Sequence, residues 1–459
     1  MTTLNTTTDL RHHLAQNNTL ALRHFCEAEH PAEVAEALST LSSYEIWEVL
    51  QATSFEIRRE ILCSFGEDTL YDLVLTLDRK VVALILTAMY SDDRANLFRR
   101  LTDEQREHLY PALAKAEREN IRKLTSYPEE SAGSVMNSDY VALRKSMSAT
   151  EAIDQIRLEA PTKETVYYAY VVDDERRLTG FVSLKDLIVA QPDAIIETFM
   201  HKEVLFARAE DDQEKAARKI QKYDLIALPV INGRDALVGI ITHDDALDII
   251  TQEQQEDLEK LMAISGQHKA GTYLKTSFWV HFKNRASWIV GLSILGLLSG
   301  TIIHSFEDSL MALMVLALYM PMVADTGGNT GSQSATVVIR ALALSEIRAG
   351  DAFKVIFKEF RVSLLMAVIL ATLSFGKVMW LSSGSDIPLG FSLPMIGATI
   401  AIALGMQVVT ATLIGAILPM AAVRMKLDPA VVASPALTTV VDITGLLIYF
   451  STAKIMLGI

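Results

Sequence analysis

A single acidic residue inside a long apolar stretch constrains this chain more than any other feature. Asp442 lies in the segment LTTVVDITGLLIYF, and no charged residue falls between Asp428 and Asp442 or between Asp442 and Lys454. The stretch is long enough to cross a bilayer as a helix. A carboxylate at that depth costs roughly 2.5 kcal/mol or more, so such residues usually face a water-filled path and carry function. The alternative is a short helix of a soluble core with the acid at its rim.

Charge divides the chain into two parts. Residues 281–459 hold 11 Lys and Arg and 9 Asp and Glu, which leaves 31 basic and 47 acidic residues in residues 1–280. An acidic part of that length is ample for two soluble domains, and the apolar remainder is typical of a membrane domain. The polar start MTTLNTTTDLRHHLAQNN has no apolar core of a signal peptide. Cys26 and Cys63, the only cysteines, predict neither a disulfide framework nor a strong metal site.

Five apolar stretches in the second part predict five membrane-spanning helices. They are residues 286–306, 310–324, 362–376, 387–423 and the stretch around Asp442. Basic residues precede the first stretch and lie between the second and third and between the fourth and fifth, whereas the alternate segments HSFEDS and SSGSDIPLG contain none. This positive-inside pattern predicts a multi-pass protein of the plasma (inner) membrane, with a cytoplasmic N-terminal half and the C-terminus outside.

A polar, glycine-rich block, residues 327–334, follows the second apolar stretch. It lies in PMVADTGGNTGSQSATVVIRALAL, which starts at Pro321. Lipid cannot satisfy such a backbone, but a cavity can, and carbonyls, hydroxyls and the Asn329 amide are hard oxygen ligands for a cation or its hydration waters. A cytoplasmic loop between helices is the alternative. Gly331 and Ser332 also suit close packing of helices.

An internal repeat organises residues 137–250. LTGFVSLKD (178–186) aligns with LVGIITHDD (237–245) at a constant offset of 59 residues, and a short apolar strand precedes each segment. Each unit is expected to run helix–strand–strand–helix. The pattern resembles a tandem of CBS domains, an α/β regulatory module of channels, transporters and enzymes. Some such tandems bind adenine nucleotides, so ATP is a possible ligand here.

The segments on either side of this repeat are predicted to be helical. Residues 20–130 contain amphipathic helices that follow polar or capping residues, typical of helical hairpins stacked in a short superhelix. After the repeat, acidic residues recur along DALDIITQEQQEDLEKLMAIS, which starts at Asp245, and several share one arc of roughly 140° on a helix. A solvated helix face is the ordinary interpretation. Because this helix leads into the first span, a charge-sensitive element here could move or block a pore.

With these parts assembled, the chain resembles the MgtE family of magnesium channels over nearly its whole length. The most specific segments are EESAGSVMNSDYVALRK (residues 129–145), the glycine-rich block, and DPAVVASPALTTVVDITGLLIYF. The resemblance implies a multidomain chain in which a superhelical N domain, a CBS tandem, a connecting (plug) helix and a five-span membrane domain follow one another. The boundaries expected are a tail at 1–19, the N domain at 20–130, CBS domains at 131–198 and 199–250, the plug helix at 251–282 and the pore domain at 283–459.

The resemblance also implies a function and a set of site residues. It implies a homodimeric, Mg²⁺-selective channel in the bilayer that is closed by cytoplasmic Mg²⁺, with no enzymatic activity and no nucleic-acid partner. Gly445, three residues after the pore aspartate, joins the pore candidates. The implied pore residues are Asp442, Gly327, Gly328, Asn329 and Gly445. The implied metal-binding residues are Asp442 and the regulatory acids Asp212, Glu214, Asp224, Asp245, Asp248, Glu253, Glu256 and Asp257, with an N-domain partner at Asp92 or Asp93, of which Asp93 is the candidate.

A physical mechanism accompanies these residues. Mg²⁺ holds its water shell tightly, so two Asp442 carboxylates, one from each subunit, could hold a hydrated ion through its waters. Without Mg²⁺ the clustered cytoplasmic acids repel one another, and bound Mg²⁺ would let the domains close and shut the pore. A divalent-cation transporter coupled to Na⁺ or H⁺ would share most of these features. An enzyme is disfavoured because the chain has neither HExxH nor GxxxxGK[ST].

Overall fold

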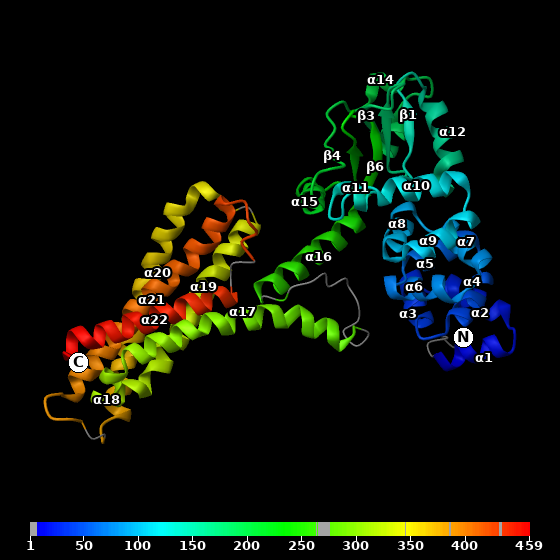
Figure 1. Cartoon of the computed structure of the whole chain (residues 1–459). Helices are drawn as coiled ribbons and strands as arrows, with labels where there is room; N and C mark the ends of the chain where they lie inside the picture. Colours follow the sequence, from blue (N-terminus) through cyan, green and yellow to red (C-terminus); the bar gives the residue numbers. More distant parts are fainter. Residues whose placement is uncertain (1–6, 263, 265–275, 345, 385–386, 431–433) are drawn as a thin grey trace. The chain divides into compact units, whose positions relative to one another are not determined.

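The computed structural model describes residues 7–262, 264, 276–344, 346–384, 387–430 and 434–459 (Figure 1). The first six residues of the expected tail lie outside this range. So do residue 263 and residues 265–275, most of the middle of the expected plug helix. The chain forms two compact units, Met1–Glu253 and Gln254–Ile459, and each is described by itself.

Short helices build the N-terminal part of the first unit. They are α1 (Thr7–Ala15), α2 (Thr19–Ala28), α3 (Pro31–Leu38), α4 (Ser43–Gln51), α5 (Phe55–Cys63), α6 (Glu67–Thr76), α7 (Arg79–Ala88), α8 (Ser91–Arg100), α9 (Asp103–Leu109), the 3-10 turn η1 (Tyr110–Ala112) and α10 (Lys115–Thr125). Each odd-numbered helix from α3 to α7 contacts the next odd one, and α4, α6 and α8 do the same, which is the packing of stacked hairpins.

Local sequence signals explain where these helices begin. Ser42 and Glu45 form a capping box at α4, since the Ser42 amide donates to Glu45 Oε2 at 2.8 Å. Ser54 caps α5. The apolar faces that follow meet in one core, which includes Trp47, Leu62 and Phe98. The predicted helical N domain is therefore confirmed.

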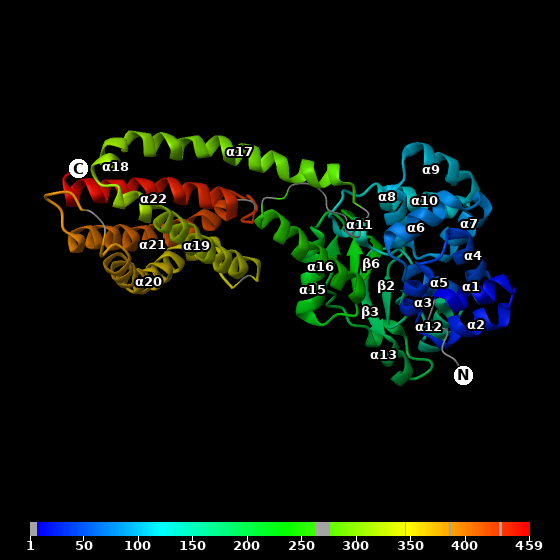
Figure 2. The same ribbon diagram turned by 90° about the horizontal axis from the view of Figure 1, so that it is seen from below.

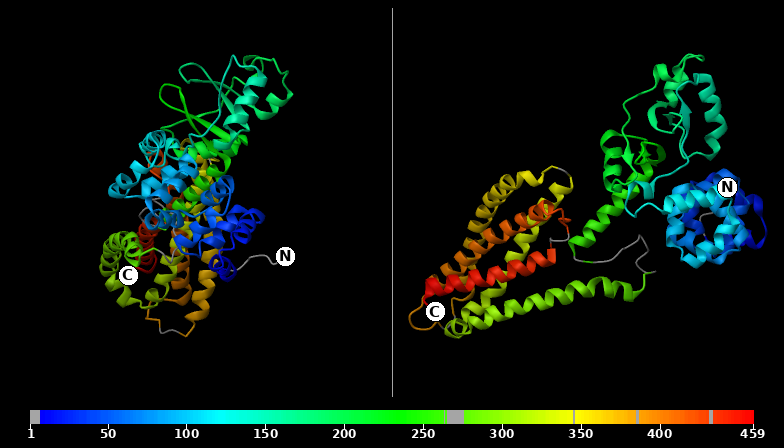
Figure 3. Two further views of the ribbon diagram at one scale, coloured as in Figure 1. Left: turned by 90° about the vertical axis from the view of Figure 1, so that its right-hand side faces the viewer. Right: turned by 45° about the horizontal axis from the view of Figure 1, so that its top comes forward.

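The second part of the first unit is the α/β repeat (Figure 3). Its elements are α11 (Ala132–Val135), β1 (Ala142–Arg144), α12 (Ala149–Glu159), η2 (Ala160–Thr162), β2 (Tyr168–Val172), β3 (Leu178–Ser183), α13 (Leu184–Val189), α14 (Ile196–Phe199), β4 (Ala207–Arg208), α15 (Gln213–Tyr223), β5 (Ala227–Ile231), β6 (Leu237–Thr242) and α16 (His243–Leu261). Two three-stranded sheets, β1-β2-β3 and β4-β5-β6, each pair one parallel and one antiparallel strand.

The sheets confirm the predicted repeat. Strands β2 and β5, and strands β3 and β6, occupy positions separated by the same 59 residues as the sequence motifs. The acid that ends each motif caps the helix that follows. Asp186 accepts from the Ser183 amide at 2.9 Å, and Asp245 accepts from the Thr242 amide at 3.2 Å. The motif is thus a strand followed by a capped helix start.

The second unit is a bundle of long helices (Figure 2). They are α17 (Phe278–Ser305), the short α18 (Glu307–Ala312), α19 (Val315–Ala343), η3 (Ala349–Asp351), α20 (Ala352–Leu381), α21 (Leu393–Arg424) and α22 (Ser434–Leu457). Helix α21 packs against α19, α20 and α22, while α17 lies along α22. Among the described residues, four helices are long and apolar enough to cross a membrane: Phe278–Ser305, Ala349–Leu381, Leu393–Arg424 and Ala436–Leu457.

The second predicted span, residues 310–324, is where the structure differs from the prediction. Helix α19 covers it from Val315 on, but the helix continues through the glycine-rich block to Ala343, with Pro321 inside. The Gly, Ser and Thr residues of the block, together with Asp325 before it, make α19 too polar to be counted with the four. The alternative of a cytoplasmic loop at this block is therefore wrong, because the block is helical and the helix satisfies its backbone.

Candidate functional site

The first candidate site lies between α19 and α22. Asp442 is half-buried on α22, and Asp325 is exposed on α19, which packs against α22. Asn329, one helical turn after Asp325, donates from Nδ2 to Asp325 Oδ2 at 3.3 Å. The two helices thus bring two carboxylates and an amide into one region of the bundle. The sequence pointed to Asp442 and Asn329, whereas Asp325 was not among the expected residues.

A buried glutamine of α21 organises the same region. Gln407 is 0% exposed, and its Nε2 donates to the Val441 carbonyl at 2.9 Å, one residue before Asp442. A Cβ added to Gly445 would lie 2.6 Å from Gln407 Nε2, and one added to Gly327 would overlap the same atom. Glycine at both positions therefore lets α19 and α22 approach this amide. Sequence reasoning missed Gln407, although it is the one amide in the uncharged stretch 387–423.

The other two glycines of the block, Gly331 and Gly328, lie against neighbouring helices. A Cβ on Gly415 of α21 would overlap the Gly331 carbonyl of α19, so the two backbones touch there. The packing role considered for Gly331 is confirmed. Gly328 is buried, and a Cβ there would lie 3.4 Å from Thr438 Cγ2, which is an ordinary van der Waals contact.

The second candidate site lies in the first unit, between the helical part and the repeat. We call it the interdomain acidic cluster, and its members are Asp92, Asp93, Glu164, Asp244 and Asp245. Asn137 is 0% exposed and joins two of these acids, since its Nδ2 lies 2.9 Å from Asp92 Oδ1 and 2.8 Å from Glu164 Oε2. Its backbone exchanges hydrogen bonds of 2.7 and 2.8 Å with Ile240 of β6. One asparagine therefore connects α8, the segment before β1 and the second sheet.

Burial and mutual repulsion dominate the electrostatics of this cluster. Burial, followed by repulsion from Asp245, raises the pKa of Asp92 well above its ordinary value. Burial and repulsion from Asp245 raise the pKa of Glu164 to about 9. Burial is also the main cause that raises the pKa of Asp93 to about 6 and that of Asp245 to about 6. These carboxylates are under-compensated, so a proton or a cation would stabilise them.

Sequence reasoning missed four residues at this site: Asp244, Glu164, Asn137 and Ser91. Glu164 and Asn137 are described above, and Ser91 donates from Oγ to Asn137 Oδ1 at 2.8 Å. Asn137 is the polar residue in the middle of EESAGSVMNSDYVALRK, the segment that carries part of the family resemblance. The available signal was an asparagine that directly follows the apolar pair Val135 and Met136 in this segment. Glu164 and Ser91 give no comparable signal, because only the packing brings them in.

Several predicted regulatory acids have local partners instead. Asp212 caps α15, accepting from the Lys215 amide at 3.1 Å. Glu214 accepts from Arg218 Nε at 2.9 Å, and Asp224 ends α15 with φ of 51°. Glu253 accepts from Gln213 Nε2 at 2.7 Å. Asp248 is exposed on α16, three residues after Asp245.

The end of α16 belongs to the second unit. Lys260 Nζ lies 2.8 Å from Glu256 Oε1 and 3.0 Å from Asp428 Oδ2, so one ammonium joins α16 to the segment before α22. Leu261 packs against a small core that contains Ala335, Ala411 and Val441. Asp257 is half-buried on the same helix. Within this unit α16 is thus fastened to helices that carry the first candidate site.

Hard oxygen donors make both sites suitable for Mg²⁺ rather than for a soft metal. In the described part of the chain, no three acidic, histidine or cysteine side chains converge closely enough to hold an ion by themselves. Mg²⁺ keeps several of its waters in proteins and needs only one or two carboxylates. The arrangement therefore fits a hydrated ion bridging carboxylates better than a closed protein cage.

Comparison with known proteins decides the family. The chain is 35% identical over 455 residues to the magnesium transporter MgtE of Thermus thermophilus, an alignment that covers 98% of each protein. The chain belongs to the MgtE family. It is also 31% identical over 429 residues to the magnesium transporter MgtE of Bacillus subtilis, covering 91% of this chain and 92% of that protein.

Family models match each part of this MgtE-family chain. Residues 320–452 match a divalent cation transporter model, residues 29–130 the MgtE intracellular N domain, and residues 132–193 and 196–252 the CBS domain. Among solved structures, the soluble part of a magnesium transporter superposes with a TM-score of 0.51 at 29% identity. It covers 54% of this chain and 97% of that one. The predicted order of N domain, CBS tandem and helical transport domain is confirmed.

Proposed function

We propose that the chain forms a homodimeric channel that imports Mg²⁺ down its electrochemical gradient. The observation that carries this proposal is the pair Asp442 and Asp325, two acids on the packed helices α22 and α19 of a mostly apolar bundle. Charged residues inside a membrane domain are expensive unless they face water or an ion. The magnesium transporters that this chain resembles over almost its full length make Mg²⁺ the cargo.

Five spans are part of the proposal. Helix α19 is long enough, at 29 residues, and lies against α21 and α22. Its polar face carries Asp325 and Asn329, so its low hydropathy is what a pore-lining helix would have. With five spans, the basic residues place the first unit in the cytoplasm and the C-terminus outside. The domain boundaries given above, including a plug helix over 251–282, belong to the same proposal.

In the pore, the chain's own groups act on a hydrated ion. Asp442 and its copy in a second subunit would accept hydrogen bonds from the waters of Mg²⁺, and the charge of the ion offsets their repulsion. Gln407 holds the backbone at Val441, so it positions Asp442 without contacting the ion. Gly327 and Gly445 keep the helices close enough for that arrangement, and Gly328 lies beside them on α19.

Cytoplasmic Mg²⁺ closes the channel by neutralising acids of the first unit and of α16. The interdomain acidic cluster is the main support for this part of the proposal. Its carboxylates repel one another, so a cation bound between them would stabilise the state that brings them together. Closure requires that the ion bind the closed state more tightly than the open one. The remaining metal candidates, Asp212, Glu214, Asp224, Asp248, Glu253, Glu256 and Asp257, contribute to the same binding through α15 and α16.

Transport by the Asp442→Asn variant tests the pore. The amide keeps the size of the side chain but removes the charge, so we expect Mg²⁺ uptake to fall by at least about 100-fold, as when about 3 kcal/mol of stabilisation is lost. Uptake is measured by growth and by ²⁵Mg accumulation in a Mg²⁺-transport-deficient strain. Asp308→Asn, an exposed acid on α18, is the matched control and should transport normally. Normal uptake by Asp442→Asn at equal expression would sink the assignment.

Flux measurements separate a channel from a coupled transporter. In proteoliposomes, a channel carries Mg²⁺ current that follows the Mg²⁺ gradient and the voltage alone. Dependence of that flux on a Na⁺ or H⁺ gradient would favour coupled transport. Binding of labelled ATP to the full chain, with and without Mg²⁺, tests whether the CBS tandem takes a nucleotide.

A further inference from the structure

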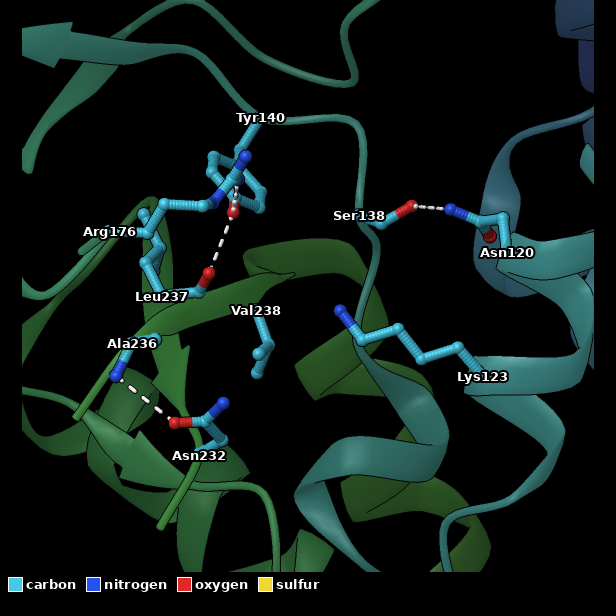
Figure 4. A pocket seen from close by; sticks show the side chains of 9 residues that line it. All are labelled: Asn120, Lys123, Ser138, Tyr140, Arg176, Asn232, Ala236, Leu237 and Val238. Carbon is cyan, nitrogen blue, oxygen red and sulfur yellow. Dashed lines mark hydrogen bonds between the residues drawn. The ribbon is translucent and has the colours of Figure 1, made fainter. Parts of the chain in front are cut away.

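A cavity of about 420 Å³ lies in the first unit, between α10 and the turns of the β2–β3 and β5–β6 hairpins (Figure 4). Its lining residues are Asn120, Lys123, Ser138, Tyr140, Arg176, Asn232, Ala236, Leu237 and Val238. The volume is within the range of small-molecule sites. Two of the lining side chains are cationic and none is acidic, in a chain whose net charge is −14. The lining of the cavity therefore carries a net positive charge, although the protein as a whole is acidic.

Most acceptors of this cavity are already engaged. Asn232 Oδ1 accepts from the amides of Arg234 and Ala236, and Ser138 Oγ accepts from Asn120 Nδ2 at 2.7 Å. The Tyr140 hydroxyl accepts from Arg176 at 2.7 Å and donates to the Leu237 carbonyl at 2.9 Å. The exception is Asn120 Oδ1, which is shielded from solvent and has no partner among the described residues.

The donors, by contrast, are available. In the part of the chain that the structure describes, the Lys123 ammonium has no hydrogen-bond or ion-pair partner, and its nitrogen points toward the middle of the cavity in Figure 4. Arg176 has one side-chain hydrogen bond, to Tyr140. The Asn232 amide nitrogen and the Ser138 hydroxyl hydrogen are likewise unengaged there. Such a set of donors suits an anion.

The hairpins hold this arrangement in place. Arg176 adopts a positive φ of 63° in the β2–β3 turn, where its amide donates to the Asp173 carbonyl at 3.0 Å. Its own carbonyl accepts from the Leu237 amide at 2.9 Å. The neighbouring Arg177 is paired with Asp173 at 2.8 Å, so the turn directs one arginine to an acid and the other to the cavity. Partial burial and the nearby Arg176 cation lower the pKa of Lys123.

We propose that this cavity binds a small organic phosphate, a ligand with one phosphate group on a compact body. Lys123, Arg176, Asn232 and Ser138 would donate to the phosphate oxygens, which accept from several directions at once. Tyr140, Leu237 and Val238 form the less polar wall, against which the body of the ligand would lie. Because Lys123 comes from α10 and the other donors from the repeat, the ligand would join the N domain to the CBS tandem.

Calorimetric titration of the full chain in detergent tests the proposal. The probes are ribose 5-phosphate, inorganic phosphate and ribose, which together separate a phosphate monoester, free phosphate and the neutral body. We expect saturable binding of ribose 5-phosphate and none of ribose. Lys123→Met and Arg176→Gln should each weaken that binding at least about tenfold, the effect of losing one charge-assisted hydrogen bond. Lys123→Arg should keep most of it.

Lys115→Met is the matched control, since Lys115 lies on the same helix and pairs with Glu119 at 3.8 Å instead of facing the cavity. It should bind like the original chain. Thermal unfolding of each variant shows that it is folded. Binding of inorganic phosphate as tight as that of ribose 5-phosphate would overturn the organic ligand. No binding of either probe at millimolar concentration, or equal binding by Lys123→Met and the original chain, would overturn the site.

Discussion

At the scale of single residues, Gln407 is the clearest example of a buried polar contact that the sequence of an apolar span does not predict. Its amide reaches Val441 and leaves space for no side chain at Gly327 or Gly445. The value of those glycines is therefore steric. They were expected in the pore, whereas the structure places both against the amide that positions Asp442.

A double-mutant cycle tests this steric relation. Gly327→Ala should destabilise the folded protein by about 1–3 kcal/mol through overpacking. Combining it with Gln407→Ala, which opens space at the same point, should give less than the sum of the two single effects. Thermal unfolding in detergent and Mg²⁺ uptake are the measurements.

Gly376→Ala on α20 is the control, because a Cβ there meets nothing within 4 Å. It should unfold at nearly the original temperature. Strict additivity of Gly327→Ala and Gln407→Ala would contradict the packing described here.

The buried acids of the interdomain cluster predict a dependence of stability on pH. Their folded pKa values are raised, so the folded state binds more protons than the unfolded chain between the two values. Stability is then fully present below the ordinary carboxyl pKa and is lost as the pH rises through the folded values, from about 6 for Asp93 and Asp245 to about 9 for Glu164. We expect the unfolding midpoint of the first unit, measured in the full chain with EDTA, to fall across that range.

Glu164→Gln provides the comparison. The glutamine side chain has the same size and can still contact Asn137, but it does not titrate. The decrease of the unfolding midpoint above about pH 6 should therefore become shallower. Saturating Mg²⁺ should flatten the profile of the original chain. A profile in EDTA that is the same with and without Glu164 would rule out this source of the dependence.

At the scale of elements, hydrophobic period and capping residues were sufficient to predict those helices and hairpins whose structure depends on local sequence alone. The two hairpins recur at the predicted offset, and α4 and α5 begin at serine caps. The glycine-rich block could not be interpreted in this way, because glycine has low helix propensity and the helix at α19 depends on contacts with α21 and α22. Ser91, Asn137 and Glu164 meet only through packing, so no local pattern identified them.

The end of α16 makes a prediction for an element. Lys260 joins Glu256 to Asp428, in front of α22. Lys260→Met should loosen α16 from the transport helices and raise the half-inhibiting Mg²⁺ concentration about fivefold, the effect of roughly 1 kcal/mol for a partly exposed pair. Patch recordings with graded cytoplasmic Mg²⁺ measure it. Lys426→Met, an exposed lysine close to the same acid in sequence, should inhibit normally; equal shifts in both variants would argue against the ion pair.

At the scale of the whole molecule, charge is divided between the units as function would require. Residues 1–280 carry 47 acidic against 31 basic residues, while the transport part is nearly neutral. The cation sensor and the ion path that we propose would therefore lie in separate regions of the chain. The sequence alone established this division, since it needs only composition, whereas the pairing of particular acids needed the structure.

Neutralising several acids together tests the sensor. The triple change Asp245→Asn, Asp248→Asn and Glu256→Gln removes carboxylates that share the binding of ions, so the dependence of inhibition on Mg²⁺ should become less steep whichever way its midpoint moves. A matched triple of exposed acids, Glu33→Gln, Asp72→Asn and Glu104→Gln, changes the net charge equally. Unchanged steepness in the first triple, or equal loss in both, would count against the sensor.

The capping contact of Asp245 limits how such a protein can be retuned. The same carboxylate starts α16, through Thr242, and faces the buried acids of the N domain. If the proposed Mg²⁺ regulation holds, a change at Asp245 would alter both the binding of the ion and the start of the helix that leads toward the membrane. A lineage that adapts to another internal magnesium level would have more freedom at Glu164, which titrates with the cluster but begins no helix.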